Sequence, residues 1–380
     1  MSATSLYCAA LHFVRVTHTT CWSFLRLRTA GGRVGEGEAT LTGREGGLVA
    51  AAERFVPLAL SEASLERPGG FAELHPPESI EEAGIVSAID QALWSLHALL
   101  DGRSLAHTLG VQRERIPVYA NINRRTEDRS PSGFAASAKA AVAGGHVAFK
   151  VAPFDEVSPA VCAQGDGVAA MHTGLARVAA VRDAVGPEAR LMVDCHWRFD
   201  EATARALAEA AAQLGVHWIE TPLPESEANV PALVRLRRQC NAWGVRLAGL
   251  ETSVGWETLR PFCEAGAYDV VMPDMKHIGG IREMQRTAAA CASLGVQVSP
   301  HNPSGPICHA ASLQVSASLG AFDMLELQFD ESPLFDALVG APFAQISDGL
   351  ATLPPGPGLG VELADAVLQR TEDQPSREWR

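Results

Sequence analysis

Residues 191–196 read Leu191-Met192-Val193-Asp194-Cys195-His196, an apolar run that stops on polar side chains. Such a run is typical of a buried strand in a parallel sheet. Because side chains alternate across a strand, Asp194 and His196 share one face. The same pattern recurs along the chain, and an ionisable residue stands where each apolar run ends: Lys150, Glu220, Glu251, Asp274, His301 and Glu326.

The intervals between these residues predict a barrel. From Lys150 onward they are 44, 26, 31, 23, 27 and 25 residues, close to the length of one strand–helix unit. We expect the Gly-rich residues 157–172 to form a surface loop. Seven strand–helix units and a closing strand predict an α/β fold, a (β/α)7β modified TIM barrel with its chemistry at the C-terminal mouth. The predicted helices lie at 131–143, 177–185, 201–214, 230–243, 256–265, 281–294 and 306–319.

The rest of the chain has a different pattern. Residues 23–28 alternate between apolar and polar side chains before a Gly-rich turn, which predicts a β-hairpin. Apolar residues spaced by three and four in 77–109 predict helices. The predicted parts are a small α+β domain over residues 1–115, the barrel over 116–330 and a segment returning to the first domain over 331–380.

The composition excludes several kinds of partner. The 380 residues are 47% hydrophobic and 20% charged, which is typical of a globular protein. The net charge of −13 repels phosphate groups, so nucleic acid and anionic membranes are poor partners. Charged residues interrupt the apolar stretches, so we expect no membrane span, and the first residues have no signal-peptide pattern. Eight scattered cysteines without CxxC spacing indicate reduced, mostly buried thiols in the cytoplasm.

Three carboxylates on successive predicted strands indicate a metal site. Asp194, Glu220 and Glu251 would crowd together at the mouth, and crowded carboxylates repel unless a cation or proton lies between them. Oxygen ligands without thiols or imidazoles favour Mg²⁺, so we expect one Mg²⁺ in the site.

The flanking residues indicate acid–base chemistry. An Asp beside a His orients the imidazole and raises its basicity, so Asp274 and His301 are the expected general base. Lys150 near a metal would lose its proton more readily, and Glu326 would stay protonated and donate to an oxyanion. These parts fit removal of the weakly acidic proton beside a carboxylate, so the expected partner is a small-molecule carboxylate.

Several motifs together resemble the enolase superfamily, in its mandelate-racemase-like branch. They are Val193-Asp194, Ile219-Glu220-Thr221-Pro222, Gly249-Leu250-Glu251-Thr252, Pro273-Asp274 with Gly279-Gly280, His301, and Leu325-Glu326. The resemblance covers nearly the whole chain. It implies that the first domain caps the barrel, that Mg²⁺ binds the three carboxylates, and that the chain forms a homo-oligomer, either a dimer or an octamer.

Two features of the resemblance bear on the reaction. Many racemases of this branch carry Lys-x-Lys on the second strand, whereas here only Lys150 remains. Asp194-Cys195-His196 resembles the acid-sugar dehydratases, notably the galactonate type, in which the histidine is the general acid for the departing hydroxyl. The leading hypothesis is therefore an Mg²⁺-dependent lyase that eliminates water from an acid sugar to give a 2-keto-3-deoxy acid. In that reaction Lys150 would hold the substrate carboxylate or act as a second acid or base.

Two alternatives stay open. The first is a racemase or epimerase that uses Lys150 and His301 on opposite faces of the substrate. The second is a homologue that binds its ligand without catalysis.

Four further residues are candidate substrate contacts. Asn121 and Asn123 end the first barrel strand, where they would touch substrate or support residues that do. Lys276 shares a face with Asp274 and could reach a ligand. Trp22 lies where the family carries its specificity loop, and we expect it to cover the mouth.

Overall fold

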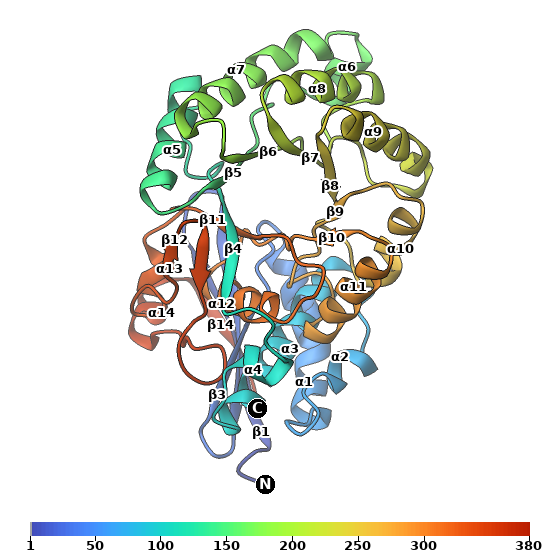
Figure 1. Cartoon of the computed structure of the whole chain (residues 1–380). Coiled ribbons are helices and arrows are strands. Elements are labelled where there is room, and N and C mark those ends of the chain that lie inside the picture. Colours follow the sequence, from blue (N-terminus) through green and yellow to red (C-terminus); the bar gives the residue numbers. More distant parts are fainter. Residues whose placement is uncertain (1) are drawn as a thin grey trace.

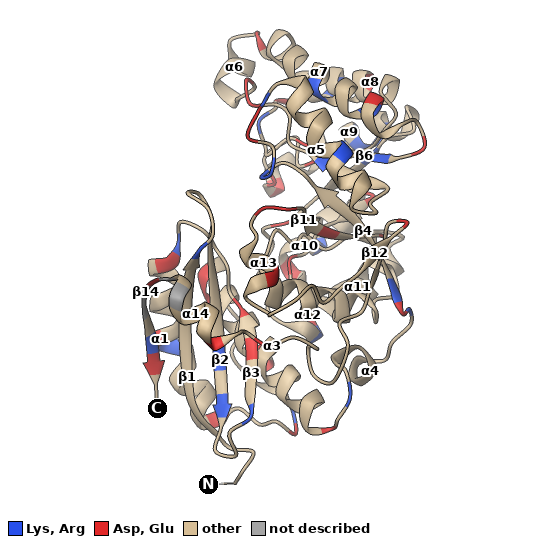
Figure 2. Cartoon of the chain, turned by 90° about the vertical axis from the view of Figure 1, so that its left-hand side faces the viewer, with Lys and Arg blue, Asp and Glu red and all other residues tan. Residues whose placement is uncertain are grey.

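The chain folds around two β-sheets. The computed structural model describes residues 2–380, without the side chains at positions 370, 372, 374 and 375. Figure 1 shows a ring of strands and helices in one half and a smaller sheet with its helices in the other, where both termini lie. The smaller sheet has the strand order β14-β1-β2-β3, and Figure 2 shows these strands side by side. The bounds are β1 Leu6–Arg15, β2 Cys21–Thr29, β3 Val34–Glu38 and β14 Glu372–Trp379.

The ring consists of parallel strands in sequence order. Each strand from β4 to β10 pairs with the next, and β11 pairs with β4. The Asp323 amide donates to the carbonyl of Val298, and the Glu326 amide to that of Pro300, which joins the segment around β11 to the segment around β10. The bounds are β4 Arg115–Asn121, β5 Ala148–Val151, β6 Arg190–Asp194, β7 Val216–Glu220, β8 Arg246–Gly249, β9 Val270–Val271, β10 Gln297–Val298 and β11 Leu325–Gln328.

The helices outside the ring begin where local sequence signals place them. Six of the seven predicted helices begin at the observed residue. Two of these starts are capped by a side chain: Ser130 accepts the Gly133 amide at the start of α5, and Asp200 accepts the Thr203 amide at the start of α8. The bounds are α5 Pro131–Ala143, α6 Pro159–Ala163, α7 Gly167–Val185, α8 Glu201–Gln213, η1 Glu227–Asn229, α9 Val230–Ala242, α10 Trp256–Glu264, α11 Ile281–Ser293 and α12 Pro306–Ser316.

The expectation of a loop over residues 157–172 is wrong. This stretch contains α6 and the start of α7, which begins ten residues before the predicted 177. Of its two glycines, Gly165 has a φ of 87° between the two helices, whereas a Cβ atom on Gly167 would lie 2.5 Å from Thr203 Oγ1. Gly174, just beyond this stretch, also serves packing. A Cβ atom on Gly174 would lie 2.3 Å from a ring carbon of Phe154, so glycine allows α7 to approach the chain after β5. A close approach of this kind depends on tertiary contacts, so local sequence pattern does not reveal it.

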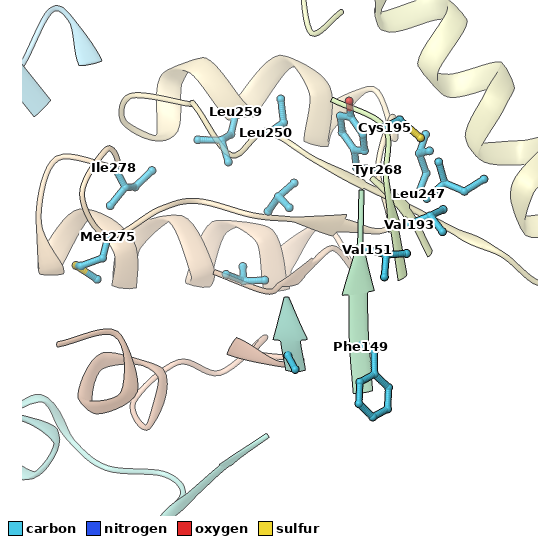
Figure 3. Close-up of a cluster of buried hydrophobic side chains, with 14 of the residues drawn as sticks. Phe149, Val151, Val193, Cys195, Leu247, Leu250, Leu259, Tyr268, Met275 and Ile278 are labelled. Carbon is cyan, nitrogen blue, oxygen red and sulfur yellow. The ribbon is translucent and has the colours of Figure 1, made fainter. Parts of the chain in front are cut away.

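The strands of the ring present two different faces. Inward-facing side chains form a cluster of their own: Tyr119, Ala148, Met192, Trp218, Ala248, Val270, Met272 and Met324. Outward-facing side chains such as Phe149, Val151 and Val193 pack with residues of the surrounding helices, and Figure 3 shows part of this buried cluster. Lys150 lies between Phe149 and Val151, so it shares the inward face with Ala148. The polar site is therefore built on the inner face, above an apolar floor.

The helix α3 (Ile80–Leu100) is the core of the smaller half. By its length and apolar composition alone, this helix could cross a membrane, whereas the sequence led us to expect no such segment. However, 83% of the 18-residue apolar stretch in this helix is buried inside the protein. It packs on α1 and on the inner side of β2 and β3. The other helices here are α1 Glu45–Glu62, α2 Gly70–Leu74 and α4 Leu105–Leu109.

The last part of the chain contacts both sheets. The strand β13 pairs antiparallel with β4, and β14 pairs antiparallel with β1. The strand β1 itself was not predicted, although it is central to the smaller sheet. The domain limits at residues 115 and 330 stay a prediction. The remaining elements are α13 Leu334–Ala337, β12 Ile346–Ser347, β13 Leu350–Thr352 and α14 Asp365–Thr371.

The cysteines agree with the sequence expectation. All eight are free thiols, and all except Cys8 are buried. They contribute to packing as small apolar groups.

Asp90 on α3 connects the two halves. Its Oδ2 accepts the amide of Ile281, the first residue of α11, at 2.7 Å, whereas its Oδ1 has no hydrogen-bond partner among the described residues. A Cβ atom on Gly280 would lie 2.7 Å from Oδ2, and Gly280 has a φ of 117°, so this contact requires glycine. Burial raises the pKa of Asp90 to about 7, although the bond to Ile281 opposes the shift.

Replacing Asp90 by Asn should remove a pH dependence of stability. Because the pKa of Asp90 rises from 3.8 to about 7 on folding, the folded chain holds a proton that the unfolded chain releases. Stability should therefore fall as pH rises through this window, by about 4 kcal/mol at most. Asp90→Asn keeps an oxygen acceptor for Ile281. Urea unfolding measures the effect. Between pH 4 and pH 7, the urea midpoint of the variant should rise relative to that of the natural protein. A constant difference between the two midpoints would contradict the raised pKa.

Candidate active site

The three predicted ligand residues come together at the mouth of the ring. Asp194 and Glu220 are paired neighbours at the ends of β6 and β7, and Glu251 follows β8. One carboxylate oxygen of each lies within 4.8 Å of the others, and all three residues are buried. Because the strands are parallel and in register, their carboxyl ends bring these side chains to one place.

The charges of these carboxylates are only partly compensated. Burial and the neighbouring carboxylates raise the pKa of Glu220 to about 8, although Lys150 opposes the shift. The pKa of Glu251 is also raised, by burial and by Asp194. Burial also disfavours the charged form of Asp194, but His196 and Lys150 outweigh it and lower that pKa.

These observations fit a metal ion. Glu251 Oε2 is buried and, within residues 2–380, accepts no hydrogen bond. A buried carboxylate oxygen without a donor is costly, and a cation would satisfy it. The residues Asp194, Glu220 and Glu251 could therefore hold a hard cation through oxygen ligands, as the sequence predicts.

Lys150 lies on the β5 side of the carboxylates. Its Nζ donates to Glu220 Oε1 at 2.6 Å and contacts Glu326 Oε1 at 2.8 Å and Asp194 Oδ2 at 3.9 Å. Burial opposes its charge, but Glu220 and Glu326 outweigh burial and raise the pKa of Lys150. Without a metal, these neighbours favour the ammonium form of Lys150, and its easier loss of a proton beside a cation stays a prediction.

Glu326 is surrounded by donors. The Asn121 side chain donates to Oε1 at 2.7 Å, and the Asn302 amide donates to Oε2 at 3.0 Å. Burial opposes ionisation, but Lys150 and His301 lower the pKa of Glu326. These donors favour the carboxylate in the metal-free protein, and the neutral, proton-donating form expected from the sequence stays a prediction.

The predicted His–Asp pair forms at the opposite side of the mouth. The distance between His301 Nδ1 and Asp274 Oδ2 is 2.8 Å, and His301 Nε2 lies 3.6 Å from Glu251 Oε2. The Asp274 carboxylate also accepts the amide and Nζ of Lys276, each within 2.8 Å. Burial opposes the charge of Asp274, but Lys276 and the nearby histidines lower its pKa. Asp274 is thus an anion that can hold the His301 ring in one orientation.

His196 lies beside the first ligand. Its Nε2 is 3.1 Å from Asp194 Oδ2, and its amide donates to Asp194 Oδ1 at 3.0 Å. The charge of Asp194 raises the pKa of His196, although burial opposes the shift. This favours the imidazolium form, which can donate a proton.

A small cavity of about 110 Å³ opens among these residues. Arg124 and Gln328 line it, and neither was predicted as a site residue. Two signals could have found them: Arg124 directly follows Asn123 at the end of a strand, and Gln328 shares the face of Glu326 two residues earlier. The cavity is lined by Asn121, Asn123, Arg124, Lys150, Ala152, Asp194, His196, His301, Pro303 and Gln328.

Trp22 and Lys276 lie outside this lining. Lys276 is buried, and its Nζ donates to Asp274 and Ser304. Trp22 is also buried and packs edge-on against Phe335. It lines a separate pocket of about 350 Å³. Direct contact of either residue with a substrate stays a prediction.

Lys276 connects the site to the smaller half. Glu38, at the end of β3, attracts Lys276 through its charge and accepts the amides of Gly305 and Cys308 at the start of α12. Ser304 precedes these amides and accepts from Lys276. The orientation of Asp274 therefore depends on contacts that reach the smaller sheet.

A ring of parallel strands with buried carboxylates and a His–Asp pair at its mouth defines an enolase-type barrel. The sequence model of the family described as "Enolase C-terminal domain-like" matches residues 133–367. The chain belongs to this family, which confirms the resemblance drawn from its motifs.

Two named relatives are acid-sugar dehydratases. The D-gluconate dehydratase of Thermoproteus tenax is 31% identical, over 93% of this chain and 70% of the relative. The D-galactonate dehydratase of Variovorax paradoxus is 28% identical, over 97% and 95%. A solved structure, the mandelate racemase/muconate lactonizing enzyme from Jannaschia sp. CCS1, has a TM-score of 0.84 at 24% identity, over 98% of this chain and 99% of the other. That likeness shows the shared fold.

Adding Mg²⁺ to metal-free protein should raise the temperature of unfolding. A ligand at a hundred times its Kd adds about 2.7 kcal/mol of stability. Glu220→Gln should reduce this gain strongly, because it removes one of the expected ligands. Differential scanning calorimetry with Mg²⁺ or with a chelator measures the effect, and an equal gain in both proteins would contradict the assigned ligands.

Proposed function

We propose that this protein is an Mg²⁺-dependent acid-sugar dehydratase. This carbon–oxygen lyase would convert a 2,3-dihydroxy carboxylate into a 2-keto-3-deoxy acid. One observation carries the proposal: His196 and His301, which follow different strands, line one cavity beside the carboxylates. Dehydration needs a base for the α-proton and an acid for the β-hydroxyl, and two histidines can supply both. The two relatives named as dehydratases support this reading.

His301 would be the base. Asp274 binds its Nδ1 at 2.8 Å, which orients the ring and stabilises the imidazolium that forms on proton uptake. The other nitrogen, Nε2, would then take the α-proton. Lys276 keeps Asp274 ionised, so the ring has a fixed anionic partner throughout.

His196 would be the acid. The pKa of His196 is raised by Asp194, so the imidazolium is available to protonate the departing hydroxyl. Its side chain is 40% exposed, so it can reach a substrate in the cavity. Protonation turns hydroxide into water, a better leaving group.

The remaining groups would bind the substrate and balance its charge. Asp194, Glu220 and Glu251 would hold Mg²⁺, which would supply positive charge where negative charge develops on the substrate carboxylate. Lys150 would bind the same carboxylate as an ammonium ion. Arg124 and Asn121 line the same cavity and would donate to hydroxyl groups of the acid sugar.

A racemase or epimerase is the second candidate. Lys150 and His301 line the same cavity, as a two-base reaction requires. In the metal-free protein the raised pKa of Lys150 favours ammonium, the form that would donate a proton while His301 removes one. Dehydration is the first candidate because His196 lines the cavity, and racemisation needs no acid for a leaving group.

One pooled assay separates these reactions. The protein is incubated in D₂O with Mg²⁺ and a library of aldonates, aldarates and N-modified amino acids. Mass spectrometry and proton NMR then detect either loss of water with a keto-deoxy signature, or gain of one deuteron at an inverted α-carbon. The first result supports dehydration and names the substrate, whereas the second replaces the proposal with racemisation.

The variant His196→Asn should lose elimination and retain exchange of the α-proton in D₂O. The reason is that His301 would still remove the proton, while the leaving group would have no acid. We expect a fall in dehydration of about 100- to 10,000-fold. His172→Asn, which changes an exposed histidine on α7, is the matched control. Loss of exchange together with elimination would argue against the acid role.

The variant His301→Asn should lose both reactions. Without the base no proton leaves the α-carbon, so neither deuterium uptake nor the keto-deoxy product should appear. Deuterium uptake by this variant at the natural rate would show that another residue, such as Lys150, is the base.

A further inference from the structure

The loop after β7 carries a carboxylate that the proposed reaction does not use. Glu225 Oε2 accepts from Nε1 of Trp197 at 2.9 Å. Its Oε1 accepts from the amide of Leu250 at 2.6 Å and from the hydroxyl of Tyr268 at 2.8 Å. The three donors follow β6, follow β8 and precede β9, so one side chain joins the ends of neighbouring strands.

These donors lie next to residues of the site. Trp197 directly follows His196, and Leu250 directly precedes Glu251. His196, Trp197 and Leu250 have φ values of 46°, 55° and 72°, in the left-handed region that residues other than glycine rarely adopt. Such a backbone persists only where surrounding contacts hold it. Two of these three strained residues bond directly to Glu225.

The packing around Glu225 is close. A Cβ atom on Gly249 would lie 2.3 Å from Glu225 Oε1 and 2.8 Å from the ring of Tyr268. Glycine at the end of β8 therefore allows the carboxylate to reach the strand. Burial raises the pKa of Glu225 because it disfavours the charged carboxylate, and the three hydrogen-bond donors oppose this shift. Tyr268 is fully buried in the cluster shown in Figure 3, so its hydroxyl is held in place.

We propose that Glu225 is a positioning residue that orients His196 through Trp197 and Glu251 through Leu250. It touches neither the cavity nor the expected reacting atoms. The roles of His196 and Glu251 rest on the proposed function, whereas the two strand ends and their bonds to Glu225 do not.

Hydrogen exchange of the metal-free protein tests the structural part. In Glu225→Ala, backbone amides of residues 195–199 and 249–252 should exchange faster, because the left-handed backbone loses its support. The matched control is Glu227→Ala, which removes an exposed carboxylate two residues away. Unchanged exchange in both segments, or faster exchange over the whole barrel, would overturn the proposal.

Metal affinity tests one arm of this proposal, the link from Glu225 through Leu250 to Glu251. By titration calorimetry with Mg²⁺, Glu225→Ala should bind about 10- to 100-fold more weakly than the natural protein, the usual effect of removing a partner behind a ligand. Glu225→Gln should bind almost normally, because its amide oxygen can still accept from Leu250 and Tyr268. An unchanged affinity in Glu225→Ala would overturn this arm.

The other arm, the link from Glu225 through Trp197 to His196, needs a different variant. Trp197→Phe removes the donor to Oε2 and leaves the Leu250 bond in place. We expect it to keep its Mg²⁺ affinity and α-proton exchange and to lose elimination, the profile expected for a displaced acid. Equal losses of exchange and elimination would overturn this arm. If the natural protein bound no Mg²⁺ or released no water, the proposed function would fail, and the exchange experiment would still decide whether Glu225 holds the strand ends.

Discussion

The constraint on which the site depends is the repulsion among carboxylates in one small, buried volume. Asp194, Glu220 and Glu251 approach one another within the reach of a single ion. Like charges at such distances, away from water, repel by several kcal/mol. Lys150 compensates part of that charge. Burial and the remaining charge together raise the pKa of Glu220 and Glu251, and the remaining charge makes the site receptive to a cation.

The surroundings hold these groups in directions that they would not adopt freely. Thr221 has a φ of 43° and donates through its hydroxyl to Asp194 Oδ1 at 3.1 Å. Asn121 binds Glu326, and Lys276 binds Asp274. The same logic extends to the smaller sheet, because Glu38 holds the start of α12. The barrel supplies the strand ends, and contacts from its own strands and loops and from the smaller sheet orient them.

Much of the fold could be predicted because local signals agree with it. Caps such as Ser130 and Asp200 determine where helices begin, and alternation along β5 predicts that Lys150 faces inward. The misses have a common cause. The strand β1 forms because β2 and β14 pair with it, and β14 lies at the far end of the chain. The unpredicted first turns of α7 include Gly174, which packs directly against Phe154 from another segment.

The sequence by itself determined the periodic order of strands and helices, the face on which each polar residue lies, and the presence of carboxylates and histidines at the strand ends. These follow from spacing and alternation, which are local properties of the backbone. Only the tertiary structure decided the partners of Lys150 and Glu326, the burial of Trp22, the entry of Arg124 into the cavity and the contacts of Glu225. Those depend on distances between segments far apart in the chain, because hydrogen bonds and electrostatic interactions act through space.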